Sequence, residues 1–390
     1  MSKISNIIFI LIINLIILYF LLYCIEIYLN LNNNTLFKEN KFYHREYLKE
    51  KYQNVDVAYA PYKLLNNKLS LVPLTGVSNT NTILCNHDNN YIVYKSDKYG
   101  FNNHNLPEVN DSIILGDSYV HGLCQDNDHT LLSYLDRMGI KAINFGMMGN
   151  GPLLQYATLI EYSNEFKSSS IVWLFNPDND FYDLSNEITD DLVLKYFKYV
   201  DFKQDLVKKN NIKDKIILNY LNYEGRIFKE KIKFYHLDLK IIRDTLQIII
   251  DNYIYNKYKV ANHDYINQNN LNNTIKIIDK TINFSKSNNK KLFFVINAIT
   301  PEIFLSDDKN KKNLRNLYLD NINKIKKFLN KRNIIYFDFN EYIYKNYDKS
   351  DIKEIFKATE KGYDHYTKNG NKLLSQKILR LFKNADLYNQ

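Results

Sequence analysis

The chain has 390 residues, 45% of them hydrophobic, which is enough for one large domain or two smaller ones with a sizeable core. Its formal net charge of +9 comes from basic residues scattered among acidic ones, as in KENKFYHREYLKEKY, and this mixture describes a solvated surface. The sequence contains no helix-turn-helix, zinc-finger or RNP pattern. We therefore expect no nucleic-acid partner.

The first apolar segment runs from Ile7 to Ile25 and is interrupted only by Asn14. Its 19 residues are close to the length that a helix needs to cross a membrane. The residues that follow, EIYL, offer no small-residue cleavage site, so residues 1–29 are predicted to be an uncleaved signal anchor rather than a removable signal peptide. Because the segment is apolar on every side, we do not expect it to be a helix of a soluble domain, which usually has one polar face.

The charges that flank this segment do not decide its orientation. Lys3 precedes it, and several basic residues follow from Lys38 onward. Residues 30–37 carry no base, however, and long domains cross membranes largely regardless of their charge. We expect a single-pass membrane protein whose main domain lies outside the cytoplasm.

The rest of the chain divides into two regions by its composition and by the alternation of predicted strands and helices. Residues 30–110 are predicted to be a stalk and an irregular lead-in, and residues 111–390 a domain of alternating strands and helices. Five strands are expected at 112–118, 141–146, 169–175, 291–298 and 333–339. Strands separated by helices predict an α/β fold, with a mainly parallel five-stranded sheet between two helical layers. Residues 187–265 have helical spacing and are predicted to be a helical insertion.

Polar and glycine-rich loops follow the first three of these strands. They are GDSYVHG, with Ser118; NFGMMGNG, with Gly149; and PDND, with Asn179. A fourth segment, YDHYTKNG with His365, lies just before the last helix. Sites in parallel sheets form at the carboxyl ends of strands. A serine, a histidine, an asparagine and glycine amides are what acyl transfer needs as nucleophile, base and oxyanion donors.

These four segments, in this order, resemble the blocks of the SGNH (GDSL-type) hydrolase superfamily, and the resemblance spans residues 113–382 without the insertion. It implies a flavodoxin-like fold in which Ser118 is the nucleophile and His365 the base. It also implies an oxyanion hole formed by the Ser118 and Gly149 amides and the Asn179 side chain. No metal or organic cofactor is implied.

The chain departs from the family pattern at two positions. The family usually has an aspartate three residues before the histidine, where this chain has Gly362. Asp364, which is adjacent to His365, is the candidate replacement; Glu360, a backbone carbonyl or a Ser–His dyad are the alternatives. Pro177 stands where a GxND pattern has glycine.

The three cysteines and His121 indicate no metal site and no second catalytic site. The sequence contains three cysteines and no C-x-x-C pair, which argues against a structural zinc site. In an oxidising compartment Cys85 and Cys124 can form a disulfide; otherwise they are two free thiols. His121 is expected to be a surface or capping group, with a place in the pocket wall as the alternative.

The resemblance and the anchor together predict a membrane-bound serine esterase that removes O-acyl groups, such as acetyl, from a cell-surface glycan or lipid. An O-acyltransferase that uses the same site is the second hypothesis. The third is a non-catalytic glycan-binding or assembly protein on the same fold, favoured by the aspartate missing at residue 362.

Overall fold

The computed structural model describes residues 3–33, 45, 48, 51–52, 54–87, 90–103, 109–233, 242, 266–359 and 362–385. The chain forms two compact units. One comprises Met1–Lys51 and Asn219–Ala261, and the other comprises Tyr52–Leu218 and Asn262–Gln390. All candidate site residues belong to the second unit.

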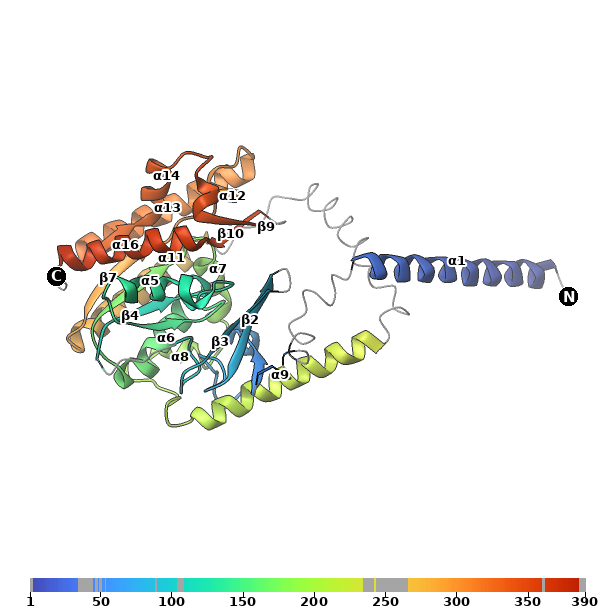
Figure 1. Ribbon diagram of the computed structural model, residues 1–390, viewed down its shortest axis with the longest axis horizontal. Coiled ribbons are helices and arrows are strands. Elements are labelled where there is room, and N and C mark those ends of the chain that lie inside the picture. The colour runs from blue at the N-terminus through green and yellow to red at the C-terminus, as the bar shows by residue number, and fades with distance from the viewer. Residues whose placement is uncertain are drawn as a thin grey trace. The chain divides into compact units, whose positions relative to one another are not determined.

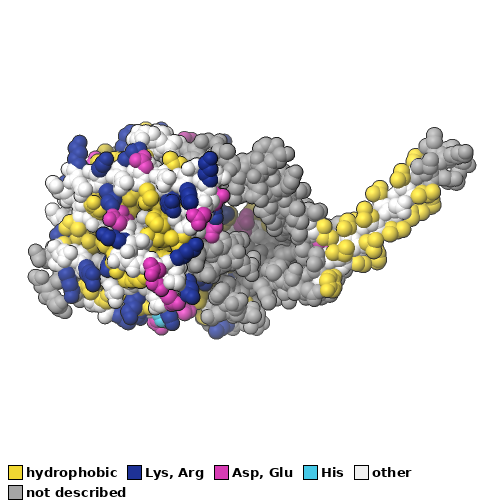
Figure 2. All heavy atoms as spheres, turned by 90° about the horizontal axis from the view of Figure 1, so that it is seen from above, with side chains coloured by type: hydrophobic (Ala, Val, Ile, Leu, Met, Phe, Trp, Pro, Cys, Tyr) yellow, Lys and Arg dark blue, Asp and Glu magenta, His cyan; other side chains and the backbone are white. Residues whose placement is uncertain are grey.

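The first unit contains helix α1 (Lys3–Asn33). Its segment Ile8–Glu26 has 19 residues and a mean hydropathy of 2.9, so it is long and apolar enough to cross a membrane. Hydrophobic side chains are exposed along this helix (Figure 2). A helix is therefore present where the sequence predicts one.

The second unit is built on a five-stranded sheet. Its strands are β4 (Val109–Gly116), β5 (Ala142–Gly146), β6 (Lys167–Phe175), β7 (Lys291–Ile296) and β8 (Ile335–Asp338). They lie in the order β5-β4-β6-β7-β8, and every neighbouring pair is parallel. The predicted strands and fold class are therefore confirmed.

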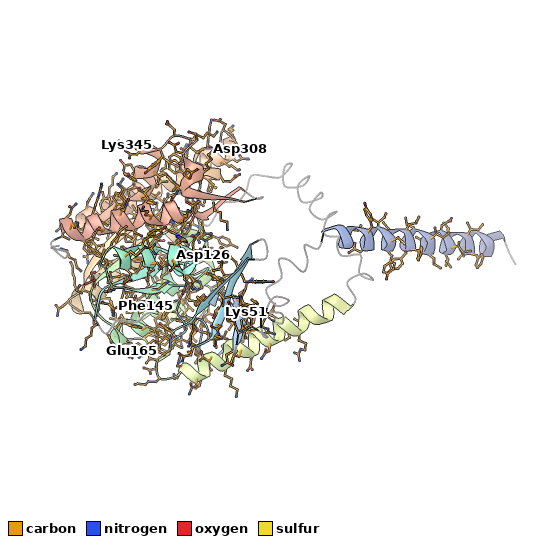
Figure 3. All side chains as sticks on the ribbon, in the orientation of Figure 1. Lys51, Asp126, Phe145, Glu165, Asp308 and Lys345 are labelled. Atoms are coloured by element: carbon orange, nitrogen blue, oxygen red, sulfur yellow. A yellow bond between two sulfur atoms is a disulfide. The ribbon has the colours of Figure 1, made fainter. Side chains whose placement is uncertain are left out.

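Helices cover both faces of this sheet (Figure 1). Ile113 and Leu115 of β4 face one core, together with α6 (Pro152–Tyr162), α11 (Gln268–Ser287) and α13 (Lys309–Lys331). Ile114 faces the other core, with α5 (Leu131–Arg137), α14 (Phe339–Asn346) and α16 (Lys368–Asn384). Alternate residues of a strand point to opposite faces, so apolar runs such as IIL supply both cores. Phe145 of β5 lies in the interior, whereas Asp308 and Lys345 lie at the periphery (Figure 3).

Shorter elements connect and flank these layers. They are β1 (Val55–Val57), η1 (Pro61–Leu64), β2 (Asn81–His87), β3 (Asn90–Lys95), α4 (Ser118–His121), η2 (Asn127–His129), η3 (Ser163–Glu165), α7 (Asp180–Glu187), α8 (Leu194–Lys198), α9 (Asn210–Lys233), α12 (Pro301–Phe304), α15 (Ile352–Ile355), β9 (Phe356–Thr359) and β10 (Gly362–Tyr366). Helices α8 and α9 lie in the segment predicted to be an insertion. Residues 234–241 and 243–265 lie outside the described part of the chain.

The lead-in differs from its prediction. The compact unit begins at Tyr52 rather than at residue 111, because apolar side chains of the lead-in pack into the core beside α6. Leu74 and Phe101 are fully buried there, and the Phe101 ring stacks on Phe145 at a centroid distance of 4.8 Å. Irregular segments have no periodic pattern to reveal such packing, so composition alone suggested an irregular lead-in that precedes the domain.

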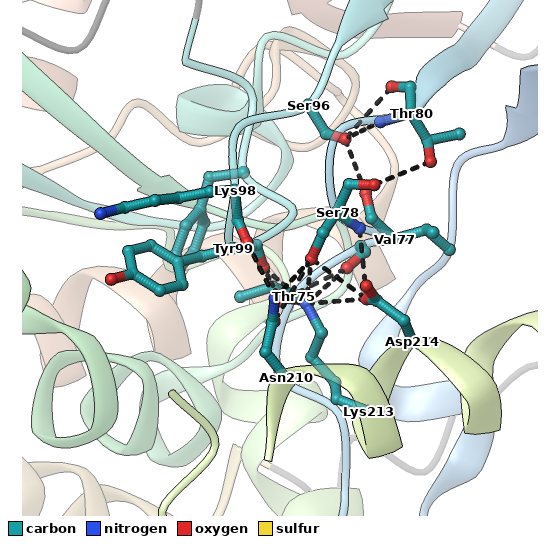
Figure 4. A network of polar contacts seen from close by, with 12 residues as sticks. Thr75, Val77, Ser78, Thr80, Ser96, Lys98, Tyr99, Asn210, Lys213 and Asp214 are labelled. Carbon is teal, nitrogen blue, oxygen red and sulfur yellow. Dashed lines mark hydrogen bonds and ion pairs between the residues drawn. The ribbon is translucent and has the colours of Figure 1, made fainter. Parts of the chain in front are cut away.

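A buried lysine ties α9 to this lead-in (Figure 4). Lys213 Nζ donates to the carbonyl oxygens of Gly76 at 2.9 Å and Tyr99 at 2.6 Å, and to Thr75 Oγ1 at 2.9 Å. Asp214 lies 3.2 Å away as its ion-pair partner. Burial lowers the pKa of Lys213 to about 8, and these acceptors satisfy an amine that would otherwise be costly to enclose.

The strand order explains where a site can form. The chain leaves β4 for its neighbour β5 on one side and later returns to β6 on the other side of β4. Such a reversal leaves a crevice at the carboxyl ends of the two strands. Asp117 and Ser118 follow β4, the loop of residues 147–151 follows β5, and Asn176–Asn179 follows β6.

Candidate active site

Ser118 and His365 come together at this edge of the sheet. Ser118 is the first residue of α4, immediately after β4 and Asp117, and His365 lies on β10, which precedes α16. Ser118 Oγ lies 2.7 Å from His365 Nε2, although 247 residues separate them in the sequence. The pair has the geometry in which an imidazole can accept the proton of a serine hydroxyl.

Aromatic and amide groups hold the strand that carries His365. The centroid of the Tyr119 ring lies 4.6 Å from the centroid of the His365 imidazole, and the two ring planes form an angle of 34°. The neighbouring Tyr366 is buried; its hydroxyl donates to Asn297 Oδ1, and its carbonyl accepts Gln125 Nε2 at 2.7 Å. Gln125 follows α4, so the segments that bear the serine and the histidine are joined directly.

Asp117 organises the polar groups beside the serine. It caps α4 by accepting the Tyr119 N–H at Oδ1, at 3.0 Å. Its other oxygen, Oδ2, accepts the side-chain amides of Asn176 at 3.1 Å and Asn179 at 3.0 Å. An amide nitrogen carries two hydrogens, so Asn179 keeps a second one for a substrate oxygen. Ser118 is the first residue of α4, so no carbonyl of this helix accepts its N–H.

Gly149 lies in a loop whose shape requires glycine. Its φ is +70°, and a Cβ atom there would overlap the ring of Tyr62 from η1. Glu187 of α7 anchors the end of the same loop by accepting the Gly151 N–H at 2.5 Å and the Leu153 N–H at 2.9 Å. The loop is thus held against both the lead-in and α7.

Several buried or half-buried carboxyl groups follow β6. Asp178 Oδ2 accepts the Thr300 N–H at 2.6 Å, and Asp180 Oδ2 accepts the Asn176 N–H at 2.7 Å. Burial raises the pKa of Asp178 to about 7 and the pKa of Asp183 to about 8, because their charged forms lose water. Glu187 adds to the effect on Asp183 by charge repulsion.

Asp183→Asn is expected to stabilise the protein more at pH 8 than at pH 5. The folded-state pKa of Asp183 is about 8 against an ordinary 3.8, so the folded chain holds the extra proton between these values and loses stability as pH rises through them. Asparagine does not ionise, so the variant does not lose this stability. We expect its gain in unfolding free energy over the wild type to be about 1–3 kcal/mol larger at pH 8 than at pH 5. Urea unfolding at both pH values measures it, and equal gains at both would contradict the assignment.

The candidate orienting acids lie outside the described side chains. Gly362 and Asp364 belong to β10, but the Asp364 side chain and all of Glu360 lie outside the described part of the structure. Pro177 is buried, and the loop after it is held by the Asp178 contact and by Tyr318 Oη, which donates to the Asp178 carbonyl at 3.0 Å. Proline in place of glycine therefore still leaves Asn179 directed at Asp117.

The structure joins Cys85 of β2 to Cys124, just after α4, in a disulfide. Within the described ranges, no group of three or more His, Cys, Asp or Glu side chains could hold a metal ion. Sequence reasoning missed the organising roles of Asp117, Asn176 and Tyr119. The signal for Asp117 was present, because an aspartate directly before a helix start is a strong N-cap candidate.

No family model matches the chain, and no curated protein matches it. Among solved structures it is similar to a member of the lipolytic protein G-D-S-L family from Veillonella parvula (13% identity, TM-score 0.36, 70% of this chain and 98% of that chain). It is also similar to the lipase/acylhydrolase from Enterococcus faecalis (12%, 0.36, 71% and 97%). A third is a GDSL-like lipase from Bacteroides thetaiotaomicron (10%, 0.36, 71% and 89%). Sequence identities and TM-scores this low carry no functional conclusion, so the function rests on the residues of the site.

Proposed function

We propose that this chain is a serine O-acyl hydrolase, held at a membrane by α1, that removes acyl groups from a cell-surface glycan or lipid. The observation that carries the proposal is the 2.7 Å contact between Ser118 Oγ and His365 Nε2. The resemblance of the four sequence blocks to SGNH hydrolases supports the same reaction.

In the first half of the reaction, His365 Nε2 takes the proton of Ser118 as Oγ attacks the ester carbonyl. The Ser118 and Gly149 amides and Asn179 Nδ2 stabilise the negative oxygen of the tetrahedral intermediate. When the intermediate collapses, the carbon–oxygen bond of the ester breaks. The leaving alcohol takes the proton from His365, and the acyl group remains on Ser118.

In the second half, His365 takes a proton from water as the water oxygen attacks the acyl-enzyme. Collapse releases the carboxylic acid and returns the proton to Ser118 Oγ. A sugar hydroxyl in place of water would give acyl transfer with the same residues. Assays of acylated glycans with and without an acceptor sugar therefore distinguish hydrolysis from transfer.

The proposed location is the outer side of the membrane. The Cys85–Cys124 disulfide supports it, because disulfides persist mainly in oxidising compartments. An anchored domain on that side would meet acylated envelope glycans and lipids. The substrate class rests on this location and on no contact in the site.

An alkyl fluorophosphonate is expected to label the full-length protein at Ser118, because the activated Oγ displaces fluoride from phosphorus. Intact mass and peptide mapping locate the adduct. Ser118→Ala should abolish labelling, whereas Ser169→Ala should not, because Ser169 lies at the start of β6 with its hydroxyl bonded to the Asp111 carbonyl. Folded wild-type protein that stays unlabelled would overturn the proposal and favour a non-catalytic binding protein.

A further inference from the structure

His121, three residues after Ser118, is enclosed between the lead-in and the loop that carries Gly149. Its side chain is fully buried at the end of α4. Its Nδ1 accepts the Met148 N–H at 3.3 Å, and its Nε2 lies 3.0 Å from Tyr94 Oη on β3. The residue is therefore neither the surface group that its sequence position suggested nor part of the Ser118–His365 pair.

These contacts define the state of the imidazole. A backbone N–H can only donate, so Nδ1 has to be the unprotonated nitrogen of a neutral ring. The proton then sits on Nε2 and points at Tyr94 Oη. In this form the ring can bridge its two partners, because Nδ1 accepts a hydrogen bond while Nε2 donates one.

The bridge acts on the loop residue directly before Gly149. The Met147 N–H donates to the Gly116 carbonyl at 3.4 Å, and the Met148 N–H donates to His121, so two successive amides of the loop are held. The next amide is that of Gly149, the candidate oxyanion donor. The orientation of that N–H depends on the peptides that precede it.

The lead-in braces His121 from the other side. Tyr94 of β3 contacts the imidazole edge-on, with ring centroids 5.4 Å apart. Cys85 of β2 is bonded to Cys124, only three residues beyond His121. In addition, Asn102 Nδ2 donates to the His121 carbonyl at 2.9 Å. The hairpin of β2 and β3 therefore fixes the end of α4 from which His121 reaches the loop.

We infer that His121 is a positioning residue for the oxyanion hole. Its Nδ1 acceptor holds the Met148 peptide so that the Gly149 N–H faces the ester oxygen that becomes negative when Ser118 attacks the carbonyl. Tyr94 in turn holds the imidazole. The inference rests on the proposed function, because an oxyanion hole has a role only if Ser118 acts as a nucleophile.

Two substitutions distinguish the contributions of the two imidazole nitrogens of His121. In His121→Asn, the side-chain oxygen can occupy the place of Nδ1 and still accept the Met148 N–H, but the contact with Tyr94 is lost. In His121→Gln, the amide can reach the place of Nε2, but the acceptor near Met148 is lost. His121→Ala removes both, and His129→Asn serves as the control at a histidine whose side chain is 40% exposed.

The measurements are kcat and KM for p-nitrophenyl acetate, the rate of Ser118 phosphonylation, and the melting temperature. We expect His121→Asn to keep kcat within about threefold of wild type, and His121→Gln and His121→Ala to lose about 10- to 100-fold with little change in KM. A purely structural role would lower the melting temperature of all three without separating their kcat values.

The outcomes distinguish the inference from the function on which it rests. Equal kcat losses in His121→Asn and His121→Gln, with wild-type Ser118 labelled normally, would overturn the inference alone. Failure of folded wild-type protein to react with the fluorophosphonate would overturn the proposed function and this inference with it. A higher kcat in His121→Asn than in His121→Gln, at similar melting temperatures, supports both.

Discussion

Replacing His365 with alanine is expected to lower kcat for an ester substrate by about 10⁴-fold or more. The imidazole is the base that lies within hydrogen-bond distance of Ser118 Oγ, at 2.7 Å, and a serine hydroxyl is a weak nucleophile without such a base. The oxyanion donors remain in this variant, so a residual rate above that in water should persist. Initial rates with p-nitrophenyl acetate over a range of concentrations measure kcat and KM separately.

The matched control for this variant is His129→Ala. The His129 side chain is 40% exposed and lies near Asp126, so its removal should leave kcat within about twofold of wild type. Thermal unfolding of both variants excludes a loss of folded protein as the cause. If His365→Ala kept more than about a tenth of wild-type activity, another group would have to serve as the base.

The fold, and the sheet edge at which the candidate site residues lie, were predictable because they depend on local pattern. Apolar runs of strand length ended in polar or glycine-rich loops, and parallel strands place such ends at one edge. Ser118, Gly149 and Asn179 follow β4, β5 and β6, which are adjacent in the sheet. Their common location therefore follows from strand order alone.

The supporting contacts could not be predicted because they depend on tertiary packing. Asp117 meets Asn179 from 62 residues away, and His121 meets Tyr94 from 27 residues away. No periodic pattern encodes such pairs. The lead-in was placed outside the domain for the same reason, although its Leu74 and Phe101 are core residues. Local signals show where a site lies, whereas the groups that orient it emerge only when the chain is packed.

Asp117→Ala is expected to lower kcat by about 10²- to 10³-fold, the usual effect of losing one oxyanion donor. The carboxylate holds Asn179 Nδ2 at 3.0 Å and caps the helix that carries Ser118, so we expect it to act through these two groups. Its removal also leaves the buried amide of Asn176 without that acceptor, which costs about 1–3 kcal/mol of stability.

A double-mutant cycle tests whether Asp117 acts through Asn179. Because both changes disable the same donor, Asp117→Ala/Asn179→Ala should be no more than about threefold slower than the slower single variant. Asp111→Ala is the control, since Asp111 lies exposed on β4 at the opposite end of the strand and bonds the Lys141 N–H. Its kcat should stay within about twofold of wild type. Fully multiplicative losses in the double variant would show that Asp117 and Asn179 contribute independently, and Asp117 would then need a role other than orienting this amide.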